Sequence, residues 1–298
     1  MTTPARRTHG GDVERLARTL GFPLEFMLDL SASLNPVGPD VAALAVSHLD
    51  SLRRYPDIAD GRRLLAEAIG VDPECLVVTN GGAEAIALVG ELISGRVEEP
   101  EFSLHPRGRA GSPLWRSNPH NPTGLLAGPD QRADVWDEAF FPLATGCWTR
   151  GDVAATAVVG SLTKLFACPG LRLGYAIADP GLIRRIEERQ PEWAIGGLAV
   201  ALLPELLAVA DPVRWAEEIG RLRGDLMVVL ARHGLCPLPS DANFILCEVP
   251  AGFREKLLRQ GIVVRDCASF GLPTFVRIAV PNSEGIERLS SALDATAL

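Results

Sequence analysis

Residues 155–175 read ATAVVGSLTKLFACPGLRLGY and place a lysine directly behind an apolar run. The run ATAVVG (155–160) is typical of a buried strand, and LGYAIA (173–178) is a second such run. Lys164 follows the first run among hydroxyl residues, and Arg172 stands eight positions after it. A lysine amine can lose its proton and attack a carbonyl, whereas hydroxyls and a guanidinium suit a phosphate dianion. The stretch therefore predicts a covalently acting lysine beside a phosphate site at the end of a strand.

Lysine is scarce in this chain, which contains 27 arginines and only two lysines, Lys164 and Lys256. A general preference for arginine accounts for most of this imbalance. Lys256 lies in FREKLLRQ (253–260), an amphipathic helical pattern in which a lysine is expected to be a solvated surface charge. An arginine cannot form an imine, because its guanidinium stays protonated. We therefore assign the chemistry to Lys164.

Strand and helix patterns alternate along the first two thirds of the chain. Strand patterns occur at 27–31, 75–79 and 133–136, and helical patterns at 12–20, 39–49, 60–69 and 83–93. Strands that alternate with helices predict an α/β fold with a mainly parallel central sheet.

The C-terminal part has a different pattern. Residues 179–233 are mostly helical, and beyond them lie strand patterns at 243–249, 261–265 and 275–280 and helical patterns at 252–260 and 283–296. This closing pattern predicts a smaller α+β unit. We expect a large domain over residues 35–210 and a small domain made of residues 1–34 and 211–298.

The composition excludes several classes of protein. Hydrophobic residues make up 47% of the 298 residues and charged residues 22%, which is ordinary globular usage. The net charge is −8 and no basic run occurs, so we expect no nucleic-acid partner. The longest apolar stretch, 198–210, is broken by Pro204 and Glu205 and is shorter than the roughly 20 residues of a membrane span.

Cysteine usage and the N-terminus favour a cytoplasmic enzyme. Six cysteines are scattered without a CxxC pair, which argues against a disulfide scaffold and against a zinc site, so no metal is expected. The N-terminal segment MTTPARRTHGGD (1–12) lacks the apolar core of a secretory signal.

A glycine turn follows the strand pattern at 75–79. Asn80, Gly81, Gly82, Ala83 and Glu84 open a helix, where free backbone N–H groups and the helix dipole favour an anion such as phosphate. Glycines after strands are often only tight turns, and by itself the motif is more often structural than functional.

Residues 118–124, NPHNPTG, form a stronger motif. Two Asn-Pro steps favour a rigid, extended loop, because proline fixes its own φ angle and restricts the residue before it. A structural loop does not need both asparagine amides, so we expect this loop to bind a ligand.

An acidic motif, Asp137-Glu138-Ala139-Phe140, ends the apolar run ADVW. A carboxylate at the C-terminal end of a strand lies where open α/β sheets bind ligands, and it can pair with a protonated ring nitrogen. Taken alone, a helix cap or a surface acid explains the motif equally well.

Five motifs follow one another along the chain: the glycine turn, the NPxNPTG loop, DEA(F/Y), S-x-(S/T)-K and the arginine. Together and in this order, they resemble the motifs of the fold-type I, pyridoxal-phosphate-dependent aminotransferase superfamily. The resemblance implies a large domain with a mainly parallel sheet, a small α+β domain and pyridoxal 5'-phosphate as cofactor. It further implies that Lys164 forms an imine with the cofactor. Asp137 then keeps the pyridine nitrogen protonated, and Asn121 bonds the ring hydroxyl.

The same resemblance assigns further cofactor contacts. It places Gly82, Ala83, Ser161 and Arg172 on the cofactor phosphate. Phe102 and His105 occur in PEFSLH (100–105), which is similar to the family's P-x-aromatic-x-x-H/Y segment, so that Phe102 stacks on the ring and His105 supports Asp137. Tyr55 matches a tyrosine that crosses a homodimer interface to the partner's cofactor phosphate, which implies a homodimer with a shared active site.

Two branches of the superfamily compete for this sequence. The chain is more similar to L-threonine-O-3-phosphate decarboxylase of cobalamin biosynthesis, notably in LDLSASLNPVG (28–38), which contains Asn35, and in RDCASF (265–270). Histidinol-phosphate aminotransferase is the alternative. Both branches accept a phosphorylated substrate, so Arg265 and His9 are the candidates for the substrate phosphate and Arg277 for the substrate carboxylate. Asn35 completes the expected substrate contacts.

The chain departs from the family in two shortened intervals, 106–117 and 125–136, where the family carries strands and crossover helices. We expect both to be reduced to loops and the sheet to be covered by other means. The candidates are the partner subunit, the N-terminal segment, or the loop residues Leu114, Trp115, Leu125, Leu126 and Trp136. Trp115 and Trp136 are expected to be substantially buried. The rival hypothesis is a cofactor-binding scaffold that has lost catalysis and serves in interaction or regulation.

Overall fold

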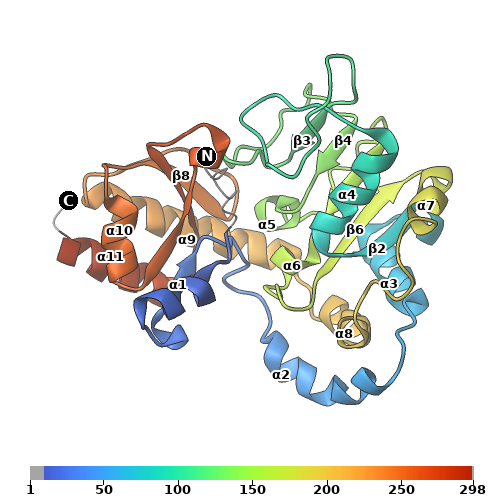
Figure 1. The fold of residues 1–298 in the computed structure, drawn as a ribbon, viewed down its shortest axis with the longest axis horizontal. Helices are drawn as coiled ribbons and strands as arrows, with labels where there is room; N and C mark the ends of the chain where they lie inside the picture. The colour runs from blue at the N-terminus through green and yellow to red at the C-terminus, as the bar shows by residue number, and fades with distance from the viewer. Residues whose placement is uncertain (1–9, 297–298) are drawn as a thin grey trace, which may run out of the picture.

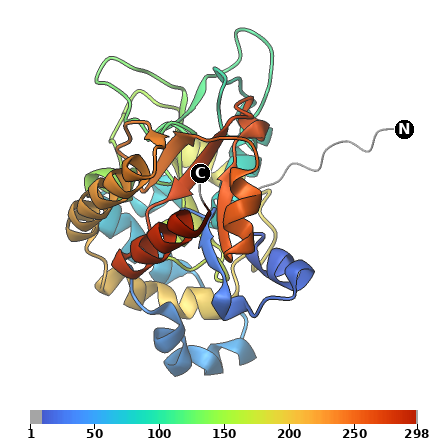
Figure 2. The ribbon, with the colours of Figure 1, turned by 90° about the vertical axis from the view of Figure 1, so that its left-hand side faces the viewer.

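The computed structural model describes residues 10–296, whose strands form two five-stranded sheets in two adjoining units (Figure 1). The larger unit, at the right of Figure 1, has the strand order β2-β6-β5-β4-β3. The smaller unit has the order β1-β9-β10-β8-β7, and it lies in front of the larger one when the molecule is turned by 90° (Figure 2).

The sheet of the larger unit is mixed and mainly parallel, because four of its five strands run in one direction and β6 runs against them. It contains β2 (Leu76–Asn80), β6 (Leu173–Ala178), β5 (Ala157–Gly160), β4 (Val135–Asp137) and β3 (Trp115–Ser117). β6 pairs antiparallel with β2 and β5, whereas β4 pairs parallel with β5 and with β3. The expected α/β fold with a mainly parallel central sheet is confirmed.

Helices cover both faces of this sheet, so the side chains of its central strands are mostly buried on both sides. One face packs against α4 (Gly81–Ile93) and α7 (Pro180–Glu187), and the other against α3 (Ala59–Ile69), α5 (Phe141–Thr145), α6 (Leu162–Leu165) and α8 (Gly197–Ala208). Successive side chains of β2 point to opposite faces, so Val77 joins the cluster of α4 and Val78 the cluster of α3 and α8.

The smaller unit is an α+β layer. Its sheet contains β1 (Leu28–Leu30), β9 (Ile262–Asp266), β10 (Phe275–Ala279), β8 (Phe244–Glu248) and β7 (Cys236–Pro237), with β1 parallel to β9 and the other pairs antiparallel. Its core includes apolar side chains of α9 (Pro212–Arg232), α10 (Phe253–Arg259) and α11 (Ser283–Thr296). The short helix α1 (Val13–Leu20) precedes β1.

Two connections join the units. The chain leaves β1, forms α2 (Val41–Ala45) and the 3₁₀ turns Val46–Arg53 at the lower edge of Figure 1, and then enters α3. Later, α9 runs from one core into the other, because Trp215 and Ile219 belong to the core of the larger unit whereas Leu222 and Leu226 belong to that of the smaller. On this arrangement we propose residues 35–210 as the large domain and residues 1–34 with 211–298 as the small domain.

The two shortened intervals contain no helix within the described chain. Residues 106–114 and 125–134 are loops, and each loop leads into a short strand, β3 or β4. Trp115 and Trp136 are both fully buried, as expected, but they belong to these strands rather than to lid loops. Trp115 opposes Val135 across the strand pair, so Trp115 and Trp136 face opposite sides of the sheet.

Loops cover the face of the sheet that carries Trp136. The guanidinium of Arg150 lies 4.9 Å from the centre of the Trp136 ring and donates hydrogen bonds to the carbonyls of Ala127 (3.1 Å) and Gly128 (2.9 Å). The Trp136 Nε1 donates to Asp152 Oδ2 at 2.9 Å. Residues 125–134 and 146–156 thus cover this face together, and Arg150 ties them to each other.

We expect Trp115→Ala to lower the free energy of unfolding by about 3–5 kcal/mol, as truncation of a large buried aromatic does. The indole is fully buried against α4 and donates from Nε1 to Ser94 O at 2.8 Å. Denaturant titration of the purified variant measures the change. Trp115→Phe, which keeps a buried ring and loses the hydrogen bond, should cost much less. A Trp115→Ala variant as stable as the parent would show that this edge of the sheet is not part of the core.

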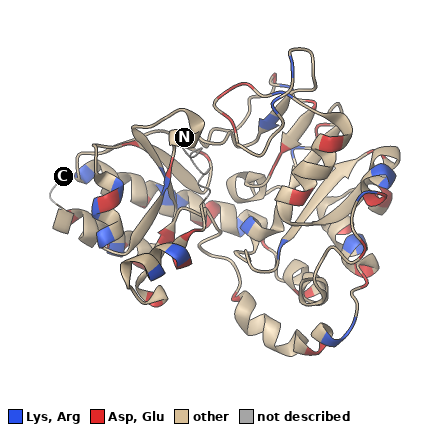
Figure 3. Ribbon diagram, in the orientation of Figure 1, with Lys and Arg blue, Asp and Glu red and all other residues tan. Residues whose placement is uncertain are grey.

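Charged residues of both signs occur on helices of both units, as on α7 and α10 (Figure 3). Within residues 10–296, no helix is both long and apolar enough to span a bilayer. The same residues contain no cluster of three or more His, Cys, Asp or Glu side chains that could hold a metal ion.

Candidate active site

A cavity of about 280 Å³ lies between the two units and collects most of the expected site residues. The larger unit supplies its floor from the ends of β4 and β5 and from the start of α4, and the smaller unit supplies residues of β9 and β10. The expected site residues on its wall are Gly82, Ala83, Phe102, Asn121, Asp137, Ser161, Lys164, Arg172, Arg265 and Arg277.

Lys164 enters this cavity from α6, which begins directly behind β5. Its Nζ donates a hydrogen bond to the carbonyl of Ala32 at 2.7 Å. Burial, with a smaller contribution from the guanidinium of Arg277, lowers the pKa of Lys164 from 10.5 to about 8. An amine with this pKa is neutral in a substantial fraction of molecules near neutral pH, which is the state that attacks a carbonyl.

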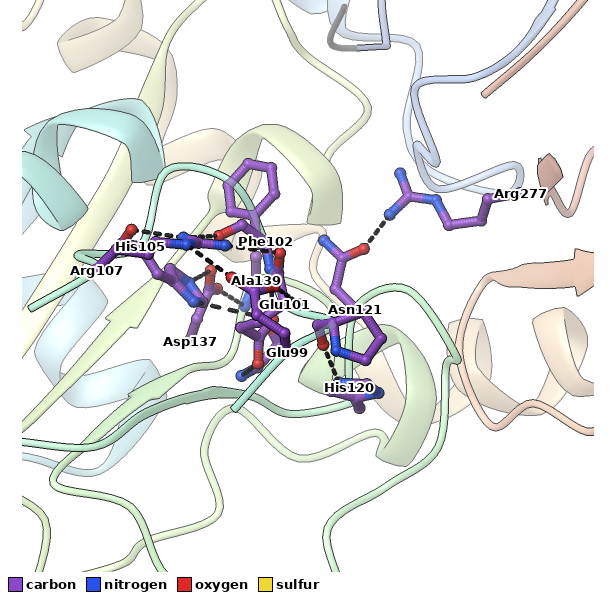
Figure 4. Close-up of polar contacts among 12 residues, drawn as sticks. Glu99, Glu101, Phe102, His105, Arg107, His120, Asn121, Asp137, Ala139 and Arg277 are labelled. Carbon is purple, nitrogen blue, oxygen red and sulfur yellow. Dashed lines mark hydrogen bonds and ion pairs between the residues drawn. The ribbon is translucent and has the colours of Figure 1, made fainter. Parts of the chain in front are cut away.

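Asp137 lies at the end of β4, with its carboxylate at the cavity wall (Figure 4). Its Oδ1 accepts from the backbone N–H of Ala139 at 3.0 Å. Its Oδ2 lies 2.9 Å from Nε2 of His105, whose side chain is completely buried. His105 therefore holds Asp137 in place from behind while the carboxylate faces the cavity.

Asn121 and Arg277 link the NPHNPTG loop to β10 of the smaller unit (Figure 4). Nη1 of Arg277 donates to Oδ1 of Asn121 at 2.6 Å, and the guanidinium lies 4.4 Å from the centre of the Phe244 ring. Burial lowers the pKa of Arg277 from 12.5 to about 10. Nε of Arg277 is buried and has no hydrogen-bond partner among the described residues, so this guanidinium has bonding capacity left for an anion in the cavity.

The glycine turn forms a cradle at the start of α4. Gly81 has a φ of +75°, which favours glycine, and a Cβ built on it would lie 2.3 Å from Nη2 of Arg172. A Cβ on Gly82 would lie 3.4 Å from the side chain of Ser161. Backbone N–H groups of a helix start, a hydroxyl and a guanidinium therefore meet at one place, and together they can bind a phosphate.

The NPHNPTG loop is held by its polar side chains. Oδ1 of Asn118 accepts from the backbone N–H of Ala127 at 2.9 Å. The ring of His120 bridges Thr123 Oγ1 (2.7 Å) and the carbonyl of Pro100 (2.8 Å). These contacts fix the loop, and Asn121 is the member of the loop that lines the cavity.

Arg265, on β9, is buried and lines the cavity beside Phe270. Its Nη2 donates to Ser269 Oγ at 3.0 Å, and burial lowers its pKa from the usual 12.5. Arg265 and Arg277 sit in register on neighbouring strands, so two guanidinium groups from the smaller unit face one cavity.

Two expected site residues, Asn35 and Tyr55, lie away from the cavity wall. Asn35 does not line the cavity, because its amide donates to Leu165 O at 2.8 Å and accepts from Val37 N at 3.0 Å; in place of a substrate contact, it holds the segment that carries Lys164. Tyr55 is 78% exposed and stacks on Trp193, away from the cavity of its own chain. His9 lies outside the described residues.

The structure adds groups that sequence patterns did not single out. The carbonyl of Ala32 accepts from Lys164, and Gly10, Ser31 and Leu104 line the same cavity. A backbone carbonyl leaves no signal in a sequence, because every residue has one. Glu101 is a buried carboxylate next to Phe102. A buried glutamate suggests a specific role, but its burial becomes visible only in the folded structure.

A model of the family described as aminotransferase class I and II matches residues 107–293, which is more than half of the chain. The chain belongs to the class I and II aminotransferase family. The histidinol-phosphate aminotransferase 1 of Dechloromonas aromatica is 30% identical, with 95% of each chain covered. The threonine-phosphate decarboxylase of Salmonella typhimurium is also 30% identical, with 96% of this chain and 95% of the relative covered.

The alignment with the Dechloromonas aminotransferase extends over 352 positions, more than the 298 residues of this chain. The relative therefore carries segments that this chain lacks, which agrees with the shortened intervals. This chain is a shortened member of the class I and II aminotransferases.

Solved structures share the fold. Histidinol-phosphate aminotransferase from Sinorhizobium meliloti, in complex with pyridoxal 5'-phosphate, has a TM-score of 0.82 at 18% identity and covers 99% of this chain and 97% of its own. L-threonine-O-3-phosphate decarboxylase from Porphyromonas gingivalis has a TM-score of 0.74 at 23% identity, with 89% and 98% covered. The expected fold-type I architecture is confirmed.

As a class I and II aminotransferase family member, the chain is a pyridoxal-phosphate-dependent enzyme. The hypothesis of a non-catalytic scaffold is therefore set aside. The residues brought together fit this cofactor: a lysine with a lowered pKa, a carboxylate at the end of a strand and a phosphate cradle line one cavity. The groups also stand on separate elements, so each can reach a different part of the ligand.

Proposed function

We propose that this enzyme removes the α-carboxylate of a phosphorylated amino acid, with L-threonine O-3-phosphate as the first substrate to test. The supporting observation is the pair of buried guanidinium groups, Arg265 and Arg277, that face one cavity. Two cations suit a substrate with two anionic groups, a carboxylate and a phosphate. Threonine phosphate carries both groups, whereas histidinol phosphate carries the phosphate alone.

The proposal gives each cofactor-binding residue a task. When bound, pyridoxal phosphate supplies an aldehyde and a ring that accepts electron density from the substrate Cα. The turn at Gly82 and Ala83, with Ser161 and Arg172, binds the cofactor phosphate. Phe102 packs on the cofactor ring. These contacts hold the ring in a fixed orientation relative to Lys164.

Three further residues control protons and orientation. Asp137 holds a proton at the ring nitrogen, because a carboxylate favours the charged form of a nearby basic group. Asn121 donates to the ring hydroxyl through the amide nitrogen that its bond to Arg277 leaves available. Lys164, with a pKa of about 8, holds the aldehyde and moves a proton at the substrate Cα.

Arg277 and Arg265 orient the substrate. The Cα bond that breaks is the one held perpendicular to the ring, and we propose that Arg277 sets this angle by gripping the carboxylate. Arg265, with His9 as its proposed companion, binds the phosphate at the other end. Phe140 and Phe270 supply the apolar wall that keeps water away from these contacts.

Amino transfer to or from a phosphorylated amine such as histidinol phosphate is the second candidate. It is favoured by the Dechloromonas relative, which is as similar to this chain as the Salmonella decarboxylase is. Product analysis with threonine phosphate separates the two reactions. Release of carbon dioxide supports decarboxylation, whereas a 2-oxo acid with the pyridoxamine form of the cofactor supports amino transfer and contradicts our proposal.

We expect threonine phosphate to be turned over far better than threonine, and Arg265→Ala to remove much of that preference. A guanidinium binds phosphate oxygens through a charge-assisted, planar contact, which alanine cannot replace. Steady-state kcat/KM on both substrates, for parent and variant, measures the effect. Lys256→Ala, on α10 of the same unit and outside the cavity, is the control and should keep the parent preference. Equal rates on both substrates in the parent would reject the phosphate pocket.

We also propose a homodimer that shares its active sites. The exposed apolar side chains of Val46, Leu49, Leu52, Tyr55 and Trp193 gather along the 3₁₀ turns and the segment that follows them. A monomer seldom exposes such a group of large apolar side chains without a partner. Tyr55 would then reach the partner's cofactor phosphate, and sedimentation of the purified enzyme tests the dimer. A cytoplasmic location stays a prediction.

A further inference from the structure

Glu101 is a buried carboxylate that the proposed reaction does not use. Its side chain is 2% exposed, and it lies in the loop between α4 and β3. Oε1 accepts from Ser117 Oγ (2.6 Å) and from the backbone N–H of Phe102 (2.7 Å), and Oε2 accepts from the backbone N–H of Ser117 (2.8 Å). Both carboxylate oxygens are therefore used as acceptors, which fixes the position of the group.

One basic group lies within ion-pair distance of this carboxylate among the described residues. Nδ1 of His105 is 3.8 Å from Oε1 of Glu101, and the side chain of His105 is completely buried. Nε2 of the same ring lies 2.9 Å from Oδ2 of Asp137. The imidazole thus stands between two buried carboxylates, one on each ring nitrogen (Figure 4).

Nδ1 of His105 has no hydrogen-bond partner among the described residues, although it is buried. A neutral ring that donates from Nε2 to Asp137 would point the lone pair of Nδ1 toward the negative charge of Glu101, which is unfavourable. A ring with a proton on both nitrogens is attracted to both carboxylates instead. It also supplies the positive charge that a buried carboxylate needs.

A further charged group, the guanidinium of Arg107, contacts the backbone of this loop and not the imidazole nitrogens. Nη1 of Arg107 donates to the backbone carbonyl of His105, and Nε of Arg107 is paired with Glu99 at 3.0 Å. The rings of Phe102 and Trp115 lie 5.6 and 5.5 Å from the imidazole, so the ring is otherwise in apolar surroundings. The two carboxylates are the charged groups that face the ring nitrogens of His105 among the described residues.

We propose that Glu101 is a positioning residue of the cofactor site: its carboxylate keeps a proton on Nδ1 of His105, so that a positively charged ring donates from Nε2 to Asp137. This inference rests on the proposed role of Asp137. A charge-assisted hydrogen bond holds Asp137 more firmly than a neutral one does. The three groups together then carry one negative charge, which matches the one positive charge of a protonated ring nitrogen.

Glu101 also contacts the edge of the larger sheet. β3 is an edge strand of the larger sheet, and an unpaired backbone donor at an edge needs a partner. The backbone N–H of Trp115 donates to Arg96 O, and that of Ser117 donates to Glu101. Glu101 therefore links the edge strand β3 to the pair of His105 and Asp137.

Nitrogen NMR of the loaded enzyme, labelled with ¹⁵N in its histidine rings, tests the proposal near neutral pH. The chain has five histidines, so the signals are few, and those absent in His105→Asn belong to His105. We expect the parent to show both nitrogens of His105 in the proton-bearing range. Glu101→Gln should move the Nδ1 signal to the range of a bare nitrogen.

Two variants separate the charge from other effects. Glu98→Gln removes a neighbouring exposed carboxylate that pairs with Arg116, and Ser117→Ala removes one hydrogen bond of Glu101 without its charge. Both variants should leave the His105 signals as in the parent. A bare Nδ1 in the parent overturns the proposal without any variant, so it is decided even where Glu101→Gln does not fold. An unchanged spectrum in Glu101→Gln also overturns it.

A failure of this inference can be distinguished from a failure of the proposed function. A bare Nδ1 together with a slow Asp137→Asn enzyme would reject the role of Glu101 alone. A protonated Nδ1 together with near-normal rates in Asp137→Asn would reject the role of Asp137 at the ring nitrogen while leaving the contact between Glu101 and His105 intact. The same spectra recorded on the cofactor-free protein show whether the proton is present before the cofactor binds.

Discussion

Lys164→Ala is expected to abolish turnover and the covalent hold on the cofactor, because alanine has no amine to join to the aldehyde. Lys164→Arg should fail equally, since a guanidinium stays protonated. The absorption spectrum of the purified protein, followed by borohydride reduction and peptide mapping, shows where the cofactor is attached. In the parent, the trapped cofactor should be found on Lys164, whose lowered pKa of about 8 makes the neutral amine available.

The chain offers a matched control, because Lys256 is its only other lysine. Lys256 lies on α10, in the unit opposite to the phosphate cradle. Lys256→Ala should keep the parent spectrum and turnover. Finding the cofactor trapped on Lys256 in the Lys164→Ala protein would show that the assignment is wrong.

Asp137→Asn should lower turnover by about 10²-fold or more, comparable to the loss of one preorganised electrostatic contact. The substitution keeps the size of the side chain and removes the charge that holds the ring nitrogen protonated. Steady-state kcat measures the loss, and thermal unfolding of the same sample shows whether the fold is intact.

Asp130→Asn, in the exposed loop before β4, removes the same charge at a distance from the cavity and should leave kcat unchanged. Rates in Asp137→Asn close to those of the parent would reject the role of this carboxylate, whatever the effect on stability.

The larger helices and strands and the main site residues could be predicted, because their signals lie in short, continuous stretches of sequence. Lys164 and Asp137 each follow a buried apolar run directly, and parallel strands bring their C-terminal ends to one edge of the sheet. The strand patterns at 155–160 and 173–178 correspond to β5 and β6, and the helical pattern at 283–296 coincides with α11. Local periodicity was sufficient for these elements.

The parts that escaped prediction depend on contacts between distant residues. Asn35 looked like a ligand contact, but its amide is used by backbone groups at Val37 and Leu165. The partner of the Lys164 amine is the carbonyl of Ala32, more than a hundred positions away in the chain. Glu101 stands at a variable position of its motif, so only the folded structure shows what it contacts.

The prediction of how the sheet is covered was right about the burial of Trp115 and Trp136 and wrong about their place in lid loops. Burial of both tryptophans follows from the cost of exposing apolar area, about 25 cal/mol per Å². The strand pattern at 133–136 indicated β4, which contains Trp136. The placement of Trp115 in β3, in contrast, was missed, because three strand residues at the end of a loop carry too little periodicity to be recognised. The role of Arg150 was not visible either, since its partners are backbone carbonyls.

The continuous helix α9 has a consequence for engineering the enzyme. Its apolar side chains are embedded in both cores, so rotating one unit against the other would bend the helix or pull side chains out of their packing. We therefore expect the two units to keep their relative orientation when a ligand enters the cavity between them. The range of substrates should respond to the size and charge of wall residues such as Leu104 and Phe270. Substitutions intended to let the units rotate would first have to disrupt the packing of α9 in both cores.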